Sequence, residues 1–209
     1  METILIADDH PLFRQALALA VGAVAPQARV IEAGTLAAAA RAASEAADLR
    51  LILLDLKMPG AVGYSGIALL HAERPAVPIL VVSSADGASA ADEARAFGAV
   101  GFLRKDSDLS VIERAIAQAL GSPAGAAAGD AAAQPVDAVR KEVANLTPTQ
   151  LKVLLAVLDG KLNKQIAYDL SMSEATVKAH MTAIMRKLDV QNRTQAALAA
   201  RALGLDLRH

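Results

Sequence analysis

The sequence contains no cysteine and no tryptophan, and aromatic residues make up only 2% of its 209 residues. The absence of cysteine excludes disulfides, a thiolate nucleophile and a cysteine-ligated zinc site. Hydrophobic residues nevertheless account for 54% of the chain, so the core must be built from aliphatic side chains and alanine. A chain of this length suffices for one or two domains with a sizeable core.

Long hydrophobic segments are also missing. A membrane-spanning helix would need about 18 uncharged apolar residues in a row, and no such run is present. The segment ALALAVGAVAP is too short and ends at Pro26, and Glu2, Asp8 and Asp9 stand where a secretory signal would carry basic residues. We therefore expect a soluble cytoplasmic protein without a membrane partner.

The net charge of −1 indicates no particular partner, but the charge is unevenly distributed. From Val143 to the end there are 9 Lys and Arg against 5 Asp and Glu, a balance of +4, which leaves −5 for the preceding residues. An acidic first part and a mildly basic second part are typical of two modules with different partners.

Short apolar runs alternate with helix-like segments up to about residue 120. Because these runs are continuous, they predict a parallel sheet covered by helices on both faces, a flavodoxin-like (βα)5 fold of the α/β class. Ligands of such folds bind beyond the carboxyl ends of the strands. The predicted strands are Thr3–Ala7, Arg29–Ala33, Leu51–Leu54, Pro78–Ser83 and Gly101–Leu103. The predicted helices are Pro11–Val24, Leu36–Ala46, Gly66–Glu73, Ala88–Phe97 and Asp108–Leu120.

The pattern changes at Gly121, where the segment GSPAGAAAGDAAAQP lacks any apolar periodicity. We predict a flexible linker over residues 121–142, in which the alanine content leaves room for some helix. Every later segment has helical spacing, which predicts a small all-α domain over residues 143–209. Its predicted helices are Pro148–Leu158, Lys164–Leu170, Glu174–Leu188 and Thr194–Leu203.

Three carboxylates follow the first and third predicted strands. Asp8 and Asp9 end the first strand, and Asp55 ends the third, in LILLDLKMPG. These strands are neighbours in the flavodoxin-like order, so the three side chains should converge at one edge of the sheet. Their mutual repulsion calls for a cation, and hard oxygen ligands of this kind suit Mg²⁺.

Polar residues end two further strands. Ser83 and Ser84 close the fourth strand, and Lys105 follows the fifth. A hydroxyl, an ammonium, a divalent cation and a carboxylate nucleophile together form a phosphoryl-transfer site, in which Asp55 attacks and the metal and lysine stabilise the phosphoryl oxygens.

Residues 1 to about 120 resemble the receiver domain of two-component response regulators. The motifs that carry the resemblance are ADDH, LDLKMPG, VVSSA and GFLRKD. In that family the switch hydroxyl precedes the lysine by about 22 positions, which selects Ser83 over Ser84. The resemblance implies that Asp55 accepts a phosphoryl group from a sensor histidine kinase, and that Phe102 changes rotamer together with Ser83.

The same resemblance implies the metal ligands. Asp8 and Asp9 would hold Mg²⁺ together with Asp55 and the backbone carbonyl of Lys57. Taken one at a time, an Asp at a strand end is usually a turn or cap residue, a lysine there is usually solvated, and a serine or phenylalanine has an ordinary structural role. All five strand ends follow one template at matching intervals, which argues against coincidence.

Other residues in this part have simpler interpretations. His10 is not needed as a ligand, and beside Pro11 we interpret it as a helix-entry residue. Tyr64 and Ser65 depart from the tighter helix start that is common in the family, which affects partner contacts rather than the chemistry.

The helical tail contains two helices separated by a tight turn. Ser173 is a natural N-cap residue, and Glu174 is well placed at the positive end of the second helix. Apolar residues on one face should pack inward, namely Val177, Met181, Ile184 and Leu188. A short helix, a turn and a longer helix with an outward basic face predict a helix-turn-helix whose second helix enters the major groove.

About 60 residues of this tail resemble the LuxR-type helix-turn-helix, through LTPTQ, DGKLNKQIA, SEATVKAH and RKLDVQNRTQA. The resemblance assigns base reading to Lys178, Ala179 and Thr182, and lysine can donate to guanine while the threonine methyl can meet thymine. It assigns phosphate contacts to Lys164, Thr176, His180 and Arg186, with packing between helices as the alternative for His180.

Two departures from the family pattern stand in this tail. Thr149-Gln150 replaces a charged pair at the start of the first helix, and Leu162 replaces a Ser or Thr, so that Asn163 would have to cap the next helix. Both affect stability or a backbone contact more than DNA binding.

The predicted protein is therefore a phosphorylation-controlled transcription factor and not an enzyme, with a receiver (1–120), a linker (121–142) and a DNA-binding domain (143–209). Its expected partners are double-stranded promoter DNA, a sensor histidine kinase and, when active, a second copy of the chain. One alternative is a Mg²⁺-dependent phosphatase, which would need a carboxylate where Lys57 stands. The other is a receiver that acts independently of phosphorylation or through protein–protein contacts.

Overall fold

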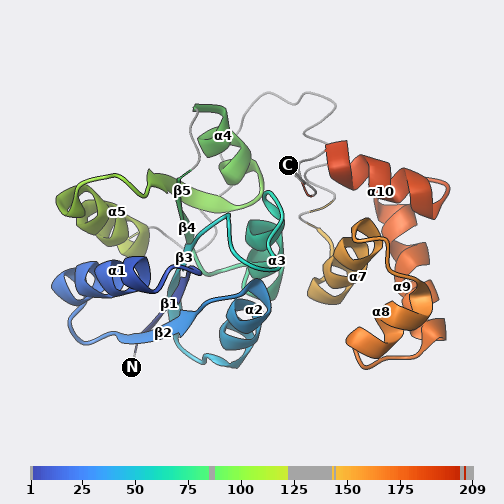
Figure 1. The fold of residues 1–209 in the computed structure, drawn as a ribbon, viewed down its shortest axis with the longest axis horizontal. Helices are drawn as coiled ribbons and strands as arrows, with labels where there is room; N and C mark the ends of the chain where they lie inside the picture. Colours follow the sequence, from blue (N-terminus) through green and yellow to red (C-terminus); the bar gives the residue numbers. More distant parts are fainter. Residues whose placement is uncertain (1, 85–87, 122–142, 144, 203–204, 206–209) are drawn as a thin grey trace. The chain divides into compact units, whose positions relative to one another are not determined.

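The computed structural model describes residues 2–84, 88–121, 143, 145–202 and 205. Contacts between residues divide the chain into two compact units, residues 1–131 and 132–209, which are described separately (Figure 1). Apart from Gly121, the predicted linker lies outside the described residues.

The first unit is built on a five-stranded parallel sheet with the strand order β2-β1-β3-β4-β5. This order confirms the predicted flavodoxin-like fold and places β1 beside β3. The third strand is two residues longer than the sequence predicted, and the fifth strand is three residues longer. The strands are β1 (Thr3–Ala7), β2 (Arg29–Ala33), β3 (Leu49–Leu54), β4 (Ile79–Ser83) and β5 (Ala99–Arg104).

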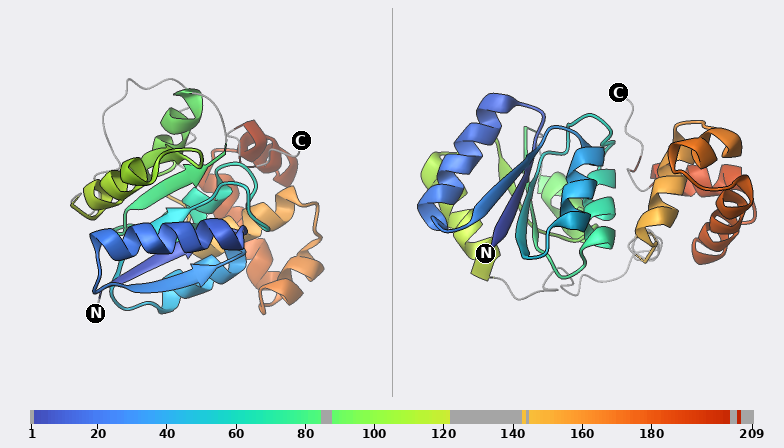
Figure 2. Two further views of the ribbon diagram at one scale, coloured as in Figure 1. Left: turned by 60° about the vertical axis from the view of Figure 1, so that its left-hand side comes forward. Right: turned by 90° about the horizontal axis from the view of Figure 1, so that it is seen from below.

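Helices cover the sheet on both faces. In Figure 2, α1 and α5 lie on one side of the sheet and α2 and α3 on the other, and α4 packs against β5. Thr35 caps α2 by accepting a hydrogen bond from the Ala38 backbone N–H, as expected for an N-cap residue. The helices are α1 (Pro11–Val24), α2 (Leu36–Glu45), α3 (Ser65–Glu73), α4 (Ala88–Ala96) and α5 (Leu109–Gly121).

The core is aliphatic, as the composition required. All five residues of β1 are buried, because a central parallel strand has no face exposed to water. Ile4 and Ile6 point into the layer below α1 and α5, where they pack with Leu17, Leu53 and Ile116. Each fully buried side chain of this size contributes about 1.5–3 kcal/mol relative to its exposed state, which holds the strand ends in fixed register.

His71 lies in the last turn of α3 and is packed against the backbone of Gly98. Gly98 has a φ of +105°, and a Cβ atom there would lie 2.8 Å from Cγ of His71, so no other residue fits without displacement of the ring. Burial lowers the pKa of His71 below its ordinary value of 6.5 because the charged imidazolium loses its hydration.

We expect the stability of this unit to fall in mild acid because of His71. The unfolded chain binds a proton near pH 6.5, whereas the folded chain resists protonation, so the stability is present above that pH and is lost as the pH falls. Urea unfolding between about pH 7.5 and pH 5 should show this loss. A His71→Gln variant should lose less stability over the same range, and identical slopes would contradict the prediction.

The second unit is entirely helical within residues 145–202. Its inward-facing residues on α9 are Val177, Met181 and Ile184, with Leu188 just beyond the helix, and all four are buried as predicted. The helices are α7 (Pro148–Leu158), α8 (Asn163–Asp169), α9 (Glu174–Lys187) and α10 (Arg193–Ala202).

Candidate functional site

The register of the sheet brings the polar strand ends together. Ala7 at the end of β1 is paired with Leu54 at the end of β3, so Asp8 and Asp55 leave the sheet side by side. The Asp55 backbone N–H donates to the Ala7 carbonyl over 2.8 Å, which continues the ladder one residue beyond the strand. The Lys105 backbone N–H donates in the same way to the Ser83 carbonyl, over 3.0 Å.

Two buried carboxylates share one ammonium group at this edge. Asp8 and Asp55 are only 1% and 2% exposed, and Nζ of Lys105 lies 2.6 Å from Oδ2 of Asp8 and 2.7 Å from Oδ2 of Asp55. Burial acts to lower the pKa of Lys105, but hydrogen bonds to Asp55 and Asp8 and their negative charges outweigh it, so its pKa is raised. One cation against two carboxylates leaves the cluster with an excess of negative charge.

Asp9 and His10 complete the cluster. One oxygen or nitrogen atom from each of Asp8, Asp9, His10 and Asp55 lies within 4.8 Å of the other three. Asp8 Oδ2 and Asp9 Oδ1 are buried and accept no hydrogen bond from the described residues, although Nζ of Lys105 and Nδ1 of His10 lie at ion-pair distances of 2.6 Å and 2.7 Å from them. Buried carboxylate oxygens with so few donors fit a hard divalent cation.

The loop after β3 positions Asp55. The Lys57 backbone N–H donates to Oδ1 of Asp55 over 3.0 Å, while the Lys57 side chain is exposed. Gly60, with a φ of +86°, lets the chain turn back so that the Pro59 carbonyl accepts from the Leu36 N–H at the start of α2. The role of the Lys57 carbonyl as a ligand stays a prediction.

The cluster opens into a cleft of about 430 Å³. Ser84 lines this cleft, whereas Ser83 is fully buried at the end of β4. Phe102 is half-buried on β5, paired with Val81 of β4. The lining residues are His10, Leu12, Phe13, Asp55, Lys57, Ser84 and Lys105. The structure therefore brings Asp8, Asp9, Asp55 and Lys105 together, and the switch roles of Ser83 and Phe102 stay predictions.

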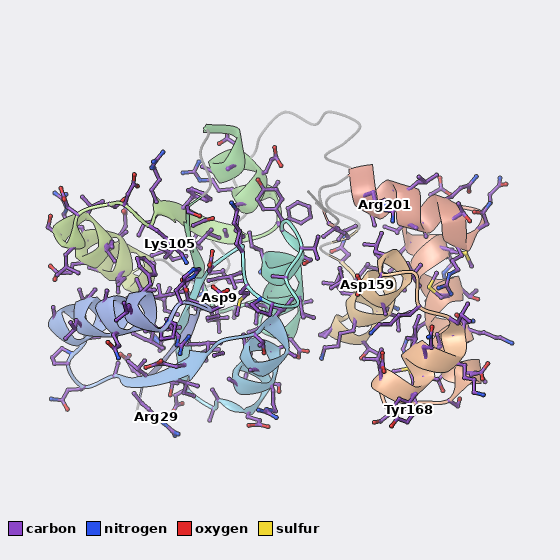
Figure 3. All side chains as sticks on the ribbon, viewed as in Figure 1. Asp9, Arg29, Lys105, Asp159, Tyr168 and Arg201 are labelled. Carbon is purple, nitrogen blue, oxygen red and sulfur yellow. The ribbon has the colours of Figure 1, made fainter. Side chains whose placement is uncertain are left out.

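Two residues of α1 support the site and were not predicted. Nζ of Lys105 lies 4.8 Å from the centre of the Phe13 ring, which adds a cation–π contact to the lysine. The Arg14 guanidinium donates to the Asp8 carbonyl over 2.8 Å and pairs with Glu32. Both residues lie in the first turn of α1, two and three positions after ADDHP, and this closeness to the motif is the only sequence signal for them. Asp9 and Lys105, from different parts of the chain, are labelled in Figure 3.

In the second unit, α8 and α9 form the predicted pair of helices joined by a tight turn. Ser171 in this turn has a φ of +52°, and Ser173 caps α9 by accepting from the Thr176 N–H over 3.1 Å. His180 is half-buried, so its side chain is partly available to both of its predicted roles. The predicted DNA contacts that are exposed are Lys164, Thr176, Lys178, Ala179, Thr182 and Arg186.

The departures at the helix starts are compensated in the structure. Gln150 completes a capping box with Thr147, and its Oε1 also accepts from Nζ of Lys187 over 2.9 Å. The expectation that Asn163 caps α8 is wrong. Asn163 is already the first helical residue, and its Oδ1 accepts from Arg193. The Gln165 side chain accepts from the Leu162 backbone N–H instead.

Residues 4–117 match the family of response regulator receiver domains, and residues 144–200 match the LuxR family of bacterial regulatory proteins. A receiver followed by a LuxR-type helix-turn-helix defines the class of transcriptional response regulators, which are regulators rather than enzymes. The chain belongs to the NarL/FixJ family of two-component response regulators.

Relatives match this chain over nearly its whole length. A glycerol metabolism activator of Pseudomonas putida is 40% identical, over 96% of this chain and 95% of the relative. The nitrate/nitrite response regulator NarP of Escherichia coli K12 is 33% identical, over 93% and 92% of the two chains. The structure of RcsB from Salmonella enterica serovar Typhimurium, bound to promoter rprA with the phosphomimetic BeF3⁻, has a similar fold (TM-score 0.50, 19% identity, 95% and 99% coverage).

The comparisons identify a regulator built from two modules. The first module carries the acidic cluster, and the second carries the helix-turn-helix with the exposed residues that are predicted to contact DNA. None of the helices in the described part of the chain has the length and apolarity that crossing a membrane requires.

Proposed function

We propose that this protein is a phosphorylation-dependent transcriptional regulator, which accepts a phosphoryl group on Asp55 from a sensor histidine kinase and binds double-stranded promoter DNA through α9. The proposed domains are a receiver over residues 1–120, a linker over 121–142 and a DNA-binding domain over 143–209. The observation that carries the proposal is the bridge from Lys105 to two buried carboxylates, of which Asp55 lines a cleft together with Lys105. Promoter DNA as the partner also favours a cytoplasmic location.

In the proposed reaction, a carboxylate oxygen of Asp55 attacks the phosphorus of a phosphohistidine. A P–O bond forms as the P–N bond breaks, and the electron pair of the broken bond stays on the histidine nitrogen. The Lys57 backbone N–H holds the Asp55 side chain in place, and Lys105 stabilises the phosphoryl oxygens. Asp8, Asp9, Asp55 and the Lys57 carbonyl would hold Mg²⁺, which supplies further positive charge at those oxygens.

Phosphorylation would then shift a population between two conformations. The new charge on Asp55 attracts Lys105 and the Ser83 hydroxyl, and Phe102 follows into the space that Ser83 vacates. The shift is limited to the extra stabilisation that the phosphoryl group gives the active conformation. A homodimer would place two recognition helices on two half-sites, which multiplies the small number of base contacts that one helix makes.

The exposed face of α9 supports the proposed DNA contacts. Lys178, Ala179 and Thr182 leave the helix on the side away from its buried residues, and the Thr182 hydroxyl donates to the Lys178 carbonyl over 3.1 Å. Lys178 would read a base edge, whereas Lys164 at the start of α8 would contact a phosphate.

We expect Lys178→Ala and Lys164→Ala to weaken DNA binding in different ways. Loss of a base contact should cost about 1–3 kcal/mol on the preferred site and relax the preference at one base pair. Loss of a phosphate contact should weaken specific and non-specific binding alike and reduce the salt slope by about 1. Binding isotherms on a duplex selected from a random library, at several salt concentrations, separate the two. Unchanged binding by Lys178→Ala would reject α9 as the recognition helix.

The proposal as a whole is tested with acetyl phosphate and Mg²⁺. We expect the protein to gain one phosphoryl group by intact mass, to gain none when EDTA is present, and to bind the selected duplex more tightly afterwards. Equal DNA affinity before and after phosphorylation would favour the alternative of a receiver that acts independently of phosphorylation.

A further inference from the structure

We propose that His10 is a nitrogen ligand of the acidic cluster, which extends the site from Mg²⁺ to first-row transition-metal cations such as Ni²⁺. The proposal rests on the proposed function in one respect, since it takes Asp8 and Asp9 as metal ligands. It concerns which cations besides Mg²⁺ this site binds, a question that the phosphoryl-transfer proposal does not address.

The backbone holds the His10 ring close to the carboxylates. His10 precedes Pro11 and is extended, with φ −89° and ψ 108°, as a residue before proline should be. Its N–H donates to Oδ1 of Asp8 over 2.8 Å, and its carbonyl accepts from the N–H groups of Phe13 and Arg14. The side chain makes no capping hydrogen bond to α1, so the helix start does not require an imidazole at this position.

The distances suit two ligands of one metal ion. Nδ1 of His10 lies 2.7 Å from Oδ1 of Asp9 and 3.4 Å from Oδ1 of Asp8. Neighbouring ligands in an octahedral shell with bonds of about 2.1 Å are about 3 Å apart, which lies between these two values. Lys105 approaches Oδ2 of Asp8 and Oδ2 of Asp55, so the lysine and the imidazole lie on different oxygens of the cluster.

The His10 side chain is exposed enough to replace its contact with Asp9 by a bond to a metal ion. Its side chain is 68% exposed, whereas Asp8 is 1% and Asp9 is 32% exposed, so the imidazole is the most accessible of the three side chains to a cation from solvent. Mg²⁺ prefers oxygen ligands and water, so a neighbouring imidazole adds little to its affinity. Ni²⁺ binds imidazole well, so the same residue should raise the affinity for Ni²⁺ selectively.

The test compares Mg²⁺ with Ni²⁺ in titration calorimetry on the full chain. Loss of a residue that only hydrogen-bonds to a metal ligand typically lowers metal affinity about 10-fold to 100-fold. Because His10→Gln removes a ligand itself, we expect it to lower the Ni²⁺ affinity by at least this much. Mg²⁺ binding should change by less than about 2-fold, because its oxygen ligands remain. His209→Gln, at a histidine outside the receiver unit, is the matched control for Ni²⁺ binding to another histidine and should change neither affinity. Asp9→Asn should weaken the binding of both Mg²⁺ and Ni²⁺.

A second measurement detects the nitrogen ligand directly and does not depend on an affinity. Cu²⁺, which like Ni²⁺ binds imidazole well, should show a nitrogen hyperfine coupling in pulsed electron paramagnetic resonance when bound to the wild type, and His10→Gln and His10→Asn should lose it. Equal changes in Mg²⁺ and Ni²⁺ affinity, or a nitrogen coupling that survives both substitutions, would overturn the proposal. If Asp9→Asn lowers the Mg²⁺ affinity while His10→Gln leaves the Ni²⁺ affinity unchanged, the inference fails and the proposed function stands. If wild type binds no Mg²⁺, the metal site of the proposed function fails.

Discussion

Replacement of Asp55 with asparagine is expected to abolish phosphoryl incorporation from acetyl phosphate. The amide has nearly the same shape as the carboxylate, and its single oxygen can still accept from one of the two donors, the Lys57 N–H or Lys105, which bond different oxygens of Asp55. It is not a nucleophile, however, and it removes one negative ligand from the cluster. Intact mass spectrometry after incubation with acetyl phosphate and Mg²⁺ measures the result directly, with the wild type gaining one phosphoryl group.

Two controls make the Asp55 result specific. Asp106→Asn removes an exposed carboxylate that pairs with Arg104 outside the cleft, and we expect it to be labelled like the wild type. Asp9→Asn leaves the nucleophile in place but removes a proposed metal ligand, so labelling should be slower at limiting Mg²⁺ and remain at Asp55. Equal labelling of Asp55→Asn and the wild type would reject Asp55 as the phosphoacceptor.

Replacement of Lys105 with methionine is expected to destabilise the metal-free protein by about 3–5 kcal/mol, the usual cost of removing one partner of a buried ion pair. Methionine keeps an unbranched stem beside Phe13, so the packing is largely preserved. Two buried carboxylates, Asp8 and Asp55, would then face each other with no ammonium between them. Urea unfolding in the presence of EDTA measures the loss of stability.

The neighbouring residue provides a matched control for Lys105. Arg104→Met removes an exposed ion pair with Asp106, which should cost at most about 1 kcal/mol. Saturating Mg²⁺ should restore part of the stability of Lys105→Met, because a ligand that binds only the folded state stabilises it. Adding Asp8→Asn to Lys105→Met should also restore stability, since it removes one of the two facing charges. Equal unfolding midpoints for Lys105→Met and Arg104→Met would contradict the prediction.

The sequence alone determined the architecture of this protein. Short apolar runs identified five parallel strands, and those of β1 and β4 contain no charged residue because a strand buried on both faces carries no alternation of polar residues. The strand order followed from the fold class, and with it the convergence of Asp8, Asp9 and Asp55. In the helical tail, the spacing of Val177, Met181 and Ile184 separated the buried face of α9 from the exposed face that carries Lys178. These features are periodic or lie at strand ends, so they can be recognised in one amino-acid sequence without a structure.

Only the tertiary structure decided which polar groups meet. The bridge from Lys105 to both Asp8 and Asp55 spans distant parts of the chain, and its geometry depends on strand register and on Phe13 below the ammonium. Asn163 bonds to Arg193 rather than capping its own helix, because α10 brings a stronger donor to it. The approach of the His10 ring to Asp9 likewise depends on rotamers and on the entry angle of α1. Periodicity specifies which face of an element a residue occupies. A hydrogen bond, in contrast, requires the donor and acceptor atoms to be placed within a few tenths of an ångström of their preferred distance.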